Sequence, residues 1–253
     1  MKKRKIILSV ATLFFAFLML TYCGNNKKYN DAIKLMEKSK YSDAQEIFQQ
    51  LDGYKDSLEK IEECQKNKFK EKIKNASVGD TITLGKYEQD NIQSNGKEDI
   101  EWIVLDIKDN KALVISKYAL DYKKYHTTYT NITWGTCSLC EWLCEDFLDS
   151  YFSSEERNII FDAQEKVFLL NASESKKYFK NNAERKCAAT KYAIASGAYS
   201  GDAGNCVWWL RSEGYAQKNT AYVNDLGEVI ESGVRVDAAI IAIRPTMWLD
   251  LNF

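Results

Sequence analysis

Proline and histidine are almost absent from this sequence of 253 residues, which holds one of each. The single proline and only 12 glycines exclude collagen-like and proline-rich chains, which need far more of these residues. An excess of positive charge is also missing, because 35 Lys and Arg stand against 36 Asp and Glu. The formal net charge of −1 argues against a nucleic-acid partner, since a general nucleic-acid binder needs a basic face to displace counterions.

Apolar residues make up 45% of the chain and charged residues 28%, which is ordinary for a globular protein. At roughly 100–200 residues per domain, a chain of this length forms one or two domains. The sequence therefore predicts a folded protein with a sizeable hydrophobic core.

The amino terminus combines four basic residues at positions 2–5 with an apolar run over positions 6–22. This order predicts an export signal. The segment 20–24 resembles a bacterial lipoprotein box, which implies that Cys23 carries a lipid and anchors the chain to the membrane. We expect residues 1–23 to be a signal peptide and lipid anchor. An uncleaved membrane anchor and plain secretion remain open, and all three alternatives place the rest of the chain outside the cytoplasm.

Residues 24–75 show apolar residues at helical spacing and form the next predicted unit. Ser42 with Gln45, and Asp56 with Glu59, predict capping boxes at the starts of two of its helices. The order Ala32, Leu35, Tyr41, Ala44 and Phe48 resembles one tetratricopeptide repeat, so we expect a small all-α helical hairpin module. The module acts as a spacer or offers a peptide-binding groove.

From residue 76 onward the pattern changes to short strands and helices. Two strands over 102–107 and 112–116 are predicted to form a hairpin through Asp109 and Asn110. A helix is expected over 138–152, and Ser153 with Glu156 predicts a capping box directly after it. Further strands are expected at 81–84 and 167–170, short helices at 172–179 and 191–196, and late strands at 206–210, 221–223, 228–230, 234–236, 239–243 and 247–249. This order predicts an α+β domain over 76–253, with mid-chain helices and a mostly antiparallel sheet at the end.

Several motifs of this domain occur in the order found in one bacterial family. They are Tyr87-Glu88-Gln89-Asp90, Thr127-Thr128-Tyr129-Thr130, Lys166-Val167-Phe168-Leu169-Leu170, Trp208-Trp209-Leu210-Arg211-Ser212 and Arg244-Pro245-Thr246-Met247-Trp248. On these motifs the chain resembles the family catalogued as domain of unknown function six-two-seven-three. The resemblance implies a C-type-lectin-like fold, related to that of sulfatase-modifying factors. Fold-level analogy of this kind implies no activity by itself.

Six tryptophans fall in this domain, and we take them as candidates for stacking on a ligand or for filling the core. Two arginines follow apolar strands, where a guanidinium pairs with a carboxylate or binds a ligand. A neighbouring Asn and Asp are candidate calcium ligands, although hard cations bind about 6–8 oxygens. The candidate ligand-binding residues are Trp134, Trp208, Trp209, Arg211, Asn224, Asp225 and Arg244.

Cysteine and histidine are the candidates for chemistry. Cys137, Cys140 and Cys144 lie at helical spacing, but thiolate metal sites usually need four ligands, so no metal and no other cofactor is predicted. Cys187 and Cys206 form the most plausible disulfide pair. Cys206 or the single His126 would serve a thiol-dependent oxidase or a hydrolase. No nucleophile motif stands near His126, so no catalytic residue is predicted.

These patterns favour an exported, membrane-anchored surface protein with a non-catalytic domain that binds a protein or a glycan. Two alternatives remain open. One is an oxidase or hydrolase that uses Cys206 or His126, and the other is an envelope assembly factor that acts through the helical repeat.

Overall fold

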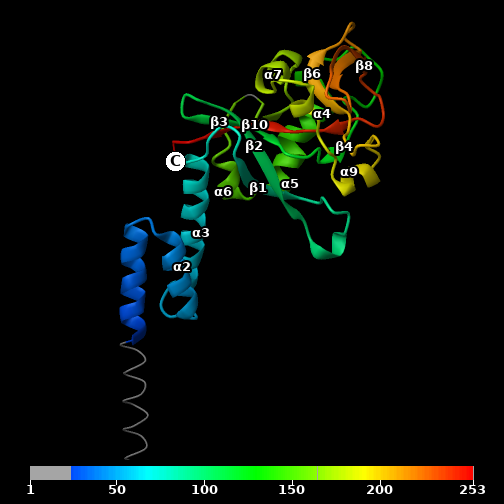
Figure 1. Ribbon diagram of the computed structural model, residues 1–253. Coiled ribbons are helices and arrows are strands. Elements are labelled where there is room, and N and C mark those ends of the chain that lie inside the picture. Colours follow the sequence, from blue (N-terminus) through cyan, green and yellow to red (C-terminus); the bar gives the residue numbers. More distant parts are fainter. Residues whose placement is uncertain (1–23, 164, 253) are drawn as a thin grey trace, which may run out of the picture. The chain divides into compact units, whose positions relative to one another are not determined.

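The computed structural model describes residues 24–163 and 165–252 (Figure 1). The chain divides into two compact units, Met1–Asn75 and Ala76–Phe253. The predicted lipidation site Cys23 and the apolar run before it lie outside the described residues. Within the described residues, no helix is both long and apolar enough to span a membrane.

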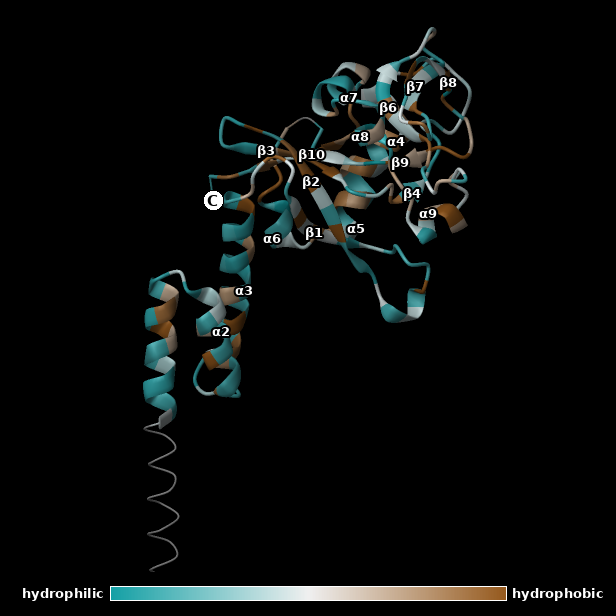
Figure 2. Ribbon diagram, in the orientation of Figure 1, coloured by the Kyte–Doolittle hydropathy of each residue, from teal (hydrophilic) through white to brown (hydrophobic). Residues whose placement is uncertain are grey.

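The first unit contains a helix over residues 24–37, followed by α2 (Tyr41–Gln50) and α3 (Ser57–Lys74). The helices present mostly hydrophilic residues, and their apolar residues are interspersed at intervals (Figure 2). Their small core is formed by Ala32, Ala44, Phe48, Leu51 and Cys64. An isolated helix of α2's length is marginal, so this shared core is what holds α2 in place.

Both predicted capping boxes in this unit are wrong. The helix α2 begins at Tyr41, one residue before Ser42, and Lys40 at its N-cap makes no side-chain cap. Asp56 is the N-cap residue of α3, but its side chain makes no cap hydrogen bond either. Its carboxylate instead accepts a hydrogen bond from the Tyr29 hydroxyl at 2.5 Å, which ties α3 to the first helix.

The second unit contains two five-stranded sheets. The first has the order β1-β2-β3-β10-β5, and all of its pairings are antiparallel. Its strands are β1 (Thr81–Tyr87), β2 (Glu98–Lys108), β3 (Lys111–Ser116), β10 (Thr246–Asp250) and β5 (Val167–Phe168). The predicted hairpin between β2 and β3 is confirmed. Asp109 and Asn110 have φ of 51° and 54°, as a two-residue hairpin turn with positive φ at both positions requires.

The second sheet has the order β4-β9-β6-β7-β8, with β6 and β9 parallel and the other pairs antiparallel. Its strands are β4 (Asp121–Tyr122), β9 (Ala242–Ile243), β6 (Trp208–Glu213), β7 (Asn219–Val223) and β8 (Val229–Arg235). The strands predicted at 228–230 and 234–236 are one continuous strand, β8. Glycine is required within this strand at position 233. Its φ is +72°, and a Cβ there would lie 2.6 Å from the Thr220 carbonyl oxygen of the neighbouring strand.

Short helices connect and cover the sheets. They are η1 (Gln93–Asn95), η2 (Trp134–Thr136), α4 (Ser138–Trp142), the π-helical η3 (Leu143–Phe147), α5 (Leu148–Tyr151), α6 (Ser154–Arg157), α7 (Ala172–Tyr178), α8 (Asn182–Arg185) and α9 (Lys191–Ala195). The helix predicted over 138–152 is thus present as α4, η3 and α5 in succession. The Ser153–Glu156 capping box before α6 is confirmed.

The α+β class with antiparallel sheets is confirmed, but the strands at the carboxy-terminal end do not all form one sheet. The strand β10 returns to the first sheet and pairs with β3 on one side and β5 on the other, as the red strand beside the green ones shows (Figure 1). Met247 and Leu249 on this strand are fully buried. Burial of these side chains favours the central position over a place at the edge of the second sheet.

Candidate functional site

Trp208 and Trp209, two of the predicted ligand-binding residues, are core residues. Neither has any exposed surface. Their indole N–H groups donate to the main-chain carbonyls of Arg185 at 3.2 Å and Lys123 at 2.9 Å. A buried indole needs such a partner for its N–H. The two rings therefore fill the interior and offer no face to a ligand.

Arg244 is also buried, with 2% of its surface exposed. Its guanidinium lies 5.1 Å from the ring centroids of both Phe179 and Trp208, and its Nε donates to the Ser116 carbonyl at 3.0 Å. Its Nη1 has no hydrogen-bond partner among the described residues. Cation–π contacts with two rings stabilise the charge inside the core, so Arg244 has a structural role rather than a ligand-binding one.

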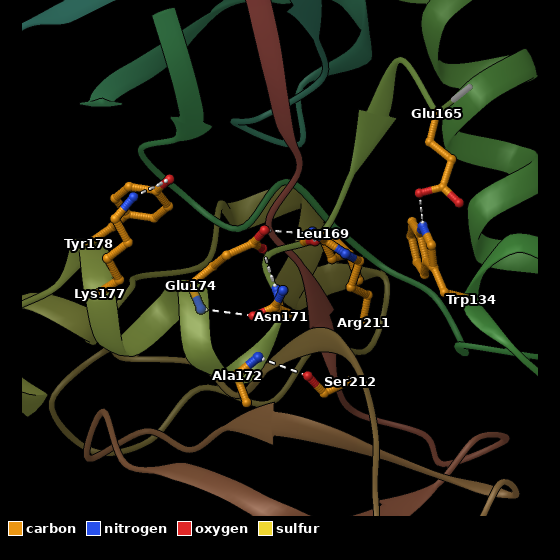
Figure 3. Close-up of polar contacts among 10 residues, drawn as sticks. All are labelled: Trp134, Glu165, Leu169, Asn171, Ala172, Glu174, Lys177, Tyr178, Arg211 and Ser212. Carbon is orange, nitrogen blue, oxygen red and sulfur yellow. Dashed lines mark hydrogen bonds and ion pairs between the residues drawn. The ribbon is translucent and has the colours of Figure 1, made fainter. Parts of the chain in front are cut away.

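Arg211 is committed to internal contacts at the start of α7. Its guanidinium forms an ion pair with Glu174 at 2.7 Å and donates to the Leu169 carbonyl (Figure 3). Glu174 also completes a capping box with Asn171, so one carboxylate serves both the helix start and the arginine. The main-chain N–H of Ala172 donates to the Ser212 hydroxyl at 2.9 Å. The predicted pairing of Arg211 with a carboxylate is present, and its partner is Glu174.

Trp134 is half-buried and stands apart from this group, beside Glu165 (Figure 3). Its indole N–H donates to the Glu165 carboxylate at 2.5 Å, and its ring packs 5.8 Å from that of Tyr125. Trp134 is partly exposed to solvent, but its indole N–H is already bonded to Glu165. The structure therefore does not bring Trp134 and Arg211 together in one site.

Asn224 shapes the turn between β7 and β8. Its side-chain oxygen accepts hydrogen bonds from the main-chain N–H groups of Leu226 at 3.0 Å and Glu228 at 2.9 Å. Its side-chain amide donates to the Glu228 carboxylate at 2.8 Å. An Asn that bonds its own backbone in this way stabilises a turn, so its oxygen is not free for calcium. The next residue, Asp225, points elsewhere.

Asp225 lines a cavity of about 240 Å³ on the surface of the second unit. The cavity lies between the 199–205 loop, the residue that follows α8, and the β7–β8 turn. Hydrogen bonds from Gly201 N–H to the Asn205 carbonyl and from Gly204 N–H to the Gly201 carbonyl, both 2.8 Å, fold the loop tightly. The cavity is lined by Lys186, Tyr199, Gly201, Asp202, Ala203, Asn205, Asp225 and Leu226.

The polar side chains of this cavity are uncommitted. Among residues 24–163 and 165–252, none of these side chains has a hydrogen-bond or ion-pair partner; they belong to Lys186, Tyr199, Asp202, Asn205 and Asp225. Tyr199 is 41% exposed and Leu226 57% exposed, so an aromatic ring and an aliphatic side chain border the polar groups. Convergent, unpaired polar groups beside apolar surface are typical of a small-molecule site.

Gly201 keeps this cavity open. A Cβ on Gly201 would lie 2.7 Å from the Asp225 carboxylate and 3.5 Å from the Tyr199 hydroxyl oxygen. The backbone of Gly201 does not have the positive φ that only glycine tolerates well. Its lack of a side chain therefore matters for space rather than for backbone conformation.

The cysteine cluster at α4 and η3 does not converge on one point. Burial raises the pKa of the Cys137 thiol to about 11. The hydrogen bond from Cys140 lowers the pKa of Cys144 to about 7.

Among the described residues, the one group with three potential metal-ligand atoms close together is Glu88, Asp90 and Glu98. These carboxylates accept hydrogen bonds from backbone N–H groups of their own loop.

The two candidates for catalysis are not arranged for it. Cys206 has no exposed surface. The Nδ1 atom of His126 accepts a hydrogen bond from the Ser138 main-chain N–H at 3.2 Å, which uses one of the two ring nitrogens. A neutral imidazole has only one acceptor nitrogen, so His126 in this arrangement has none left to act as a base.

Sequence reasoning found Asp225 but missed the residues that complete its cavity. The run Gly201-Asp202-Ala203-Gly204-Asn205 is rich in turn-forming polar residues, and this was the available signal. Nothing in the spacing indicates that Lys186 lies beside it.

Two comparisons, with curated proteins and with solved structures, found no match. A family model described as Domain of unknown function (DUF6273) matches residues 109–172 and 160–251. The matched ranges cover more than half of the chain and include every residue that lines the cavity. The chain therefore belongs to this family of domains of unknown function, as its sequence motifs predicted.

Proposed function

We propose that this protein is an exported, membrane-anchored lipoprotein whose 76–253 domain binds a glycan without catalysis. The observation that carries the proposal is the cavity at Asp225, where four polar side chains that have no hydrogen-bond or ion-pair partner among the described residues lie beside the ring of Tyr199. The basic and apolar segment before Cys23 supports export and lipidation.

The lining suits a sugar better than a purely apolar or purely ionic ligand. Sugar hydroxyls both donate and accept hydrogen bonds. The carboxylates of Asp202 and Asp225 accept, the ammonium of Lys186 donates, and the amide of Asn205 does both. Tyr199 and Leu226 supply apolar surface for the C–H face of a ring. A volume of about 240 Å³ lies below the range for drug-sized ligands and favours one terminal sugar unit.

A C-type-lectin-like arrangement of the domain agrees with this proposal and stays a prediction from the sequence resemblance. The same holds for the tetratricopeptide-like nature of residues 24–75, which we regard as a spacer. The oxidase and hydrolase alternatives lose support because Cys206 is buried.

We expect Asp225→Asn and Gly201→Ala each to weaken glycan binding by about 10–100-fold. A hydrogen bond to a charged group contributes roughly 1.5–3 kcal/mol, which corresponds to this range of affinity. The Cβ of the new alanine would lie 2.7 Å from the Asp225 carboxylate and would push that carboxylate out of its position. The measurement is binding of the full chain to an array of bacterial and host glycans, followed by calorimetric titration of the best glycan.

Asp99→Asn is the matched control, because Asp99 is an exposed aspartate on β2 that pairs with Lys86 at 3.4 Å and does not line the cavity. This variant should bind like the parent. Capture of no glycan by the parent, or equal affinity of all four proteins, would contradict the proposal. Release of shortened glycan during the titration would show that the site is catalytic instead.

The lipid anchor is tested by Cys23→Ala in the full chain expressed in a bacterial host. We expect the parent to partition into detergent and the variant to lose its lipid, because alanine lacks the thiol to which the first lipid is attached as a thioether. Mass spectrometry of the amino-terminal peptide checks the modification. An unmodified peptide that begins with Met1 in the parent would exclude the lipoprotein.

A further inference from the structure

Cys187 and Cys206 lie directly opposite each other in a short antiparallel pairing. Ala188 and Asn205 form an antiparallel bridge, so the next residues outward, Cys187 and Cys206, are partners. The main-chain N–H of Cys206 donates to the carbonyl of Cys187 at 2.7 Å. Opposite residues of an antiparallel pair point to the same face, which places the two thiols together.

This backbone geometry accommodates a disulfide without rearrangement. Opposite residues in a hydrogen-bonded antiparallel pair have Cα atoms about 5.5 Å apart. Disulfides usually join Cα atoms about 4.4–6.8 Å apart. The two thiols already form a hydrogen bond with each other in the reduced protein.

The surroundings favour Cys187 as the first thiol to react, because the hydrogen bond between the two thiols raises the pKa of Cys206. Burial raises the pKa of Cys187, but the hydrogen bond from Cys206 and the positive charge of Arg244 more than offset this, so the pKa lies below its ordinary value. A larger thiolate fraction favours attack on a disulfide. Only 3% of Cys187 and none of Cys206 is exposed, so a bond formed during folding would be protected from reductants afterwards.

We propose that Cys187 and Cys206 form a cross-strand disulfide when the chain folds in an oxidising environment. The Cys187 thiolate attacks a donor disulfide, such as that of a thiol oxidase or of oxidised glutathione, and one donor thiol leaves. The Cys206 thiolate then displaces the second donor thiol and closes the S–S bond. The two cysteines lose two electrons and two protons, and the donor disulfide becomes two thiols.

Cys140 and Cys144 also share a hydrogen bond, but they lie one turn apart on a continuous helical segment. Cβ atoms on one helix face run in parallel, and Cβ vectors that do not converge cannot be bridged without backbone movement. This pair is therefore expected to stay reduced and serves as an internal control.

The disulfide would close the segment that carries the cavity loop. Tyr199, Gly201, Asp202 and Asn205 all lie between the two cysteines, and Lys186 directly precedes the first. Fixing both ends of this segment reduces the conformations open to the loop before a ligand binds. The disulfide itself does not depend on glycan binding, because it rests on the backbone pairing and on the contact between the two thiols.

The test is refolding of the purified full chain in a buffer of reduced and oxidised glutathione. The refolded protein is acid-quenched, unfolded, labelled with iodoacetamide and digested for mass spectrometry. We expect a peptide pair joined through Cys187 and Cys206, while Cys64, Cys137, Cys140 and Cys144 take the label. Labelling of both Cys187 and Cys206, or a link that joins either of them to any other cysteine, would overturn the proposal.

Thermal unfolding of the same protein gives a second readout. We expect the oxidised chain to unfold about 5–10 °C above the reduced chain, as estimated for a loop of this length in a domain of this size. Cys206→Ala should abolish this difference, and Cys140→Ala should preserve it. A difference that persists in Cys206→Ala would assign the stabilisation to another bond and would contradict the proposal.

Discussion

Replacing Gly227 with alanine is expected to lower the free energy of unfolding of the second unit by about 3–5 kcal/mol. Gly227 has a φ of +81°, and a Cβ there would lie 1.9 Å from the carbonyl oxygen and 2.7 Å from the carbonyl carbon of Asn182. These are backbone atoms of another element, so no side-chain rotation relieves the overlap. The β7–β8 turn and the start of α8 would have to separate.

Separation would also break the hydrogen bonds that hold the turn in place. The Nε of Arg185 donates to the Gly227 carbonyl at 2.9 Å, and Nη1 of the same guanidinium donates to the Phe179 carbonyl at 3.0 Å. Arg185 is only 8% exposed. A buried guanidinium that loses an acceptor retains its desolvation penalty, which adds to the steric cost.

Gly204→Ala separates the steric effect from the backbone effect. Gly204 has a similar φ of +78°, but no atom lies within 4 Å of the Cβ position. Only the left-handed conformation should then cost stability, by about 1–2 kcal/mol. Urea unfolding followed by circular dichroism measures both variants. Equal losses of unfolding free energy in the two variants would contradict the close approach of Gly227 to the Asn182 backbone.

The second large effect is expected for Trp208→Ala, at about 3–5 kcal/mol of unfolding free energy. The indole is fully buried, packs 6.5 Å from Phe179 by ring centroids, and lies on the guanidinium of Arg244. Its removal leaves a cavity and deprives the cation of one of its two aromatic contacts. The substitution therefore acts on folding rather than on ligand capture.

Trp134→Ala is the comparison that separates a core tryptophan from a surface one. Trp134 is half-buried and would lose its contact with Tyr125 and its hydrogen bond to Glu165, a loss of under about 2 kcal/mol. Denaturant unfolding by tryptophan fluorescence and by circular dichroism measures both losses. A larger loss of unfolding free energy for Trp134→Ala than for Trp208→Ala would contradict the placement of Trp208 in the core and of Trp134 at the surface.

Features determined by a few neighbouring residues were predictable from the sequence. Asp109 and Asn110 indicate the β2–β3 hairpin because both tolerate positive φ. Ser153 and Glu156 predict a helix start because the cap involves only those residues. The same pattern failed at Ser42, because α2 begins one residue earlier, at Tyr41. It failed at Asp56 because that carboxylate accepts a hydrogen bond from the Tyr29 hydroxyl instead of capping α3.

The candidate site depended on contacts that sequence spacing does not encode. The apolar run Trp208-Trp209-Leu210 at the start of β6 is buried, but its composition gave no indication of which tryptophan of the domain reaches solvent. Lys186, Asn205 and Asp225 approach one another only after β7 and β8 have paired and their turn has docked against α8. Local pattern identified one of these three residues, and tertiary packing determined the cavity.

The central position of β10 has a consequence for the order of assembly. Its neighbours β3 and β5 are synthesised well before it, and neither is paired with the other. Until β10 arrives, each presents an open row of backbone amides and carbonyls to any passing strand. In a chain synthesised from its amino terminus, both edges stay open to other strands until Thr246–Asp250 has been made, so we expect this sheet to be completed late in folding.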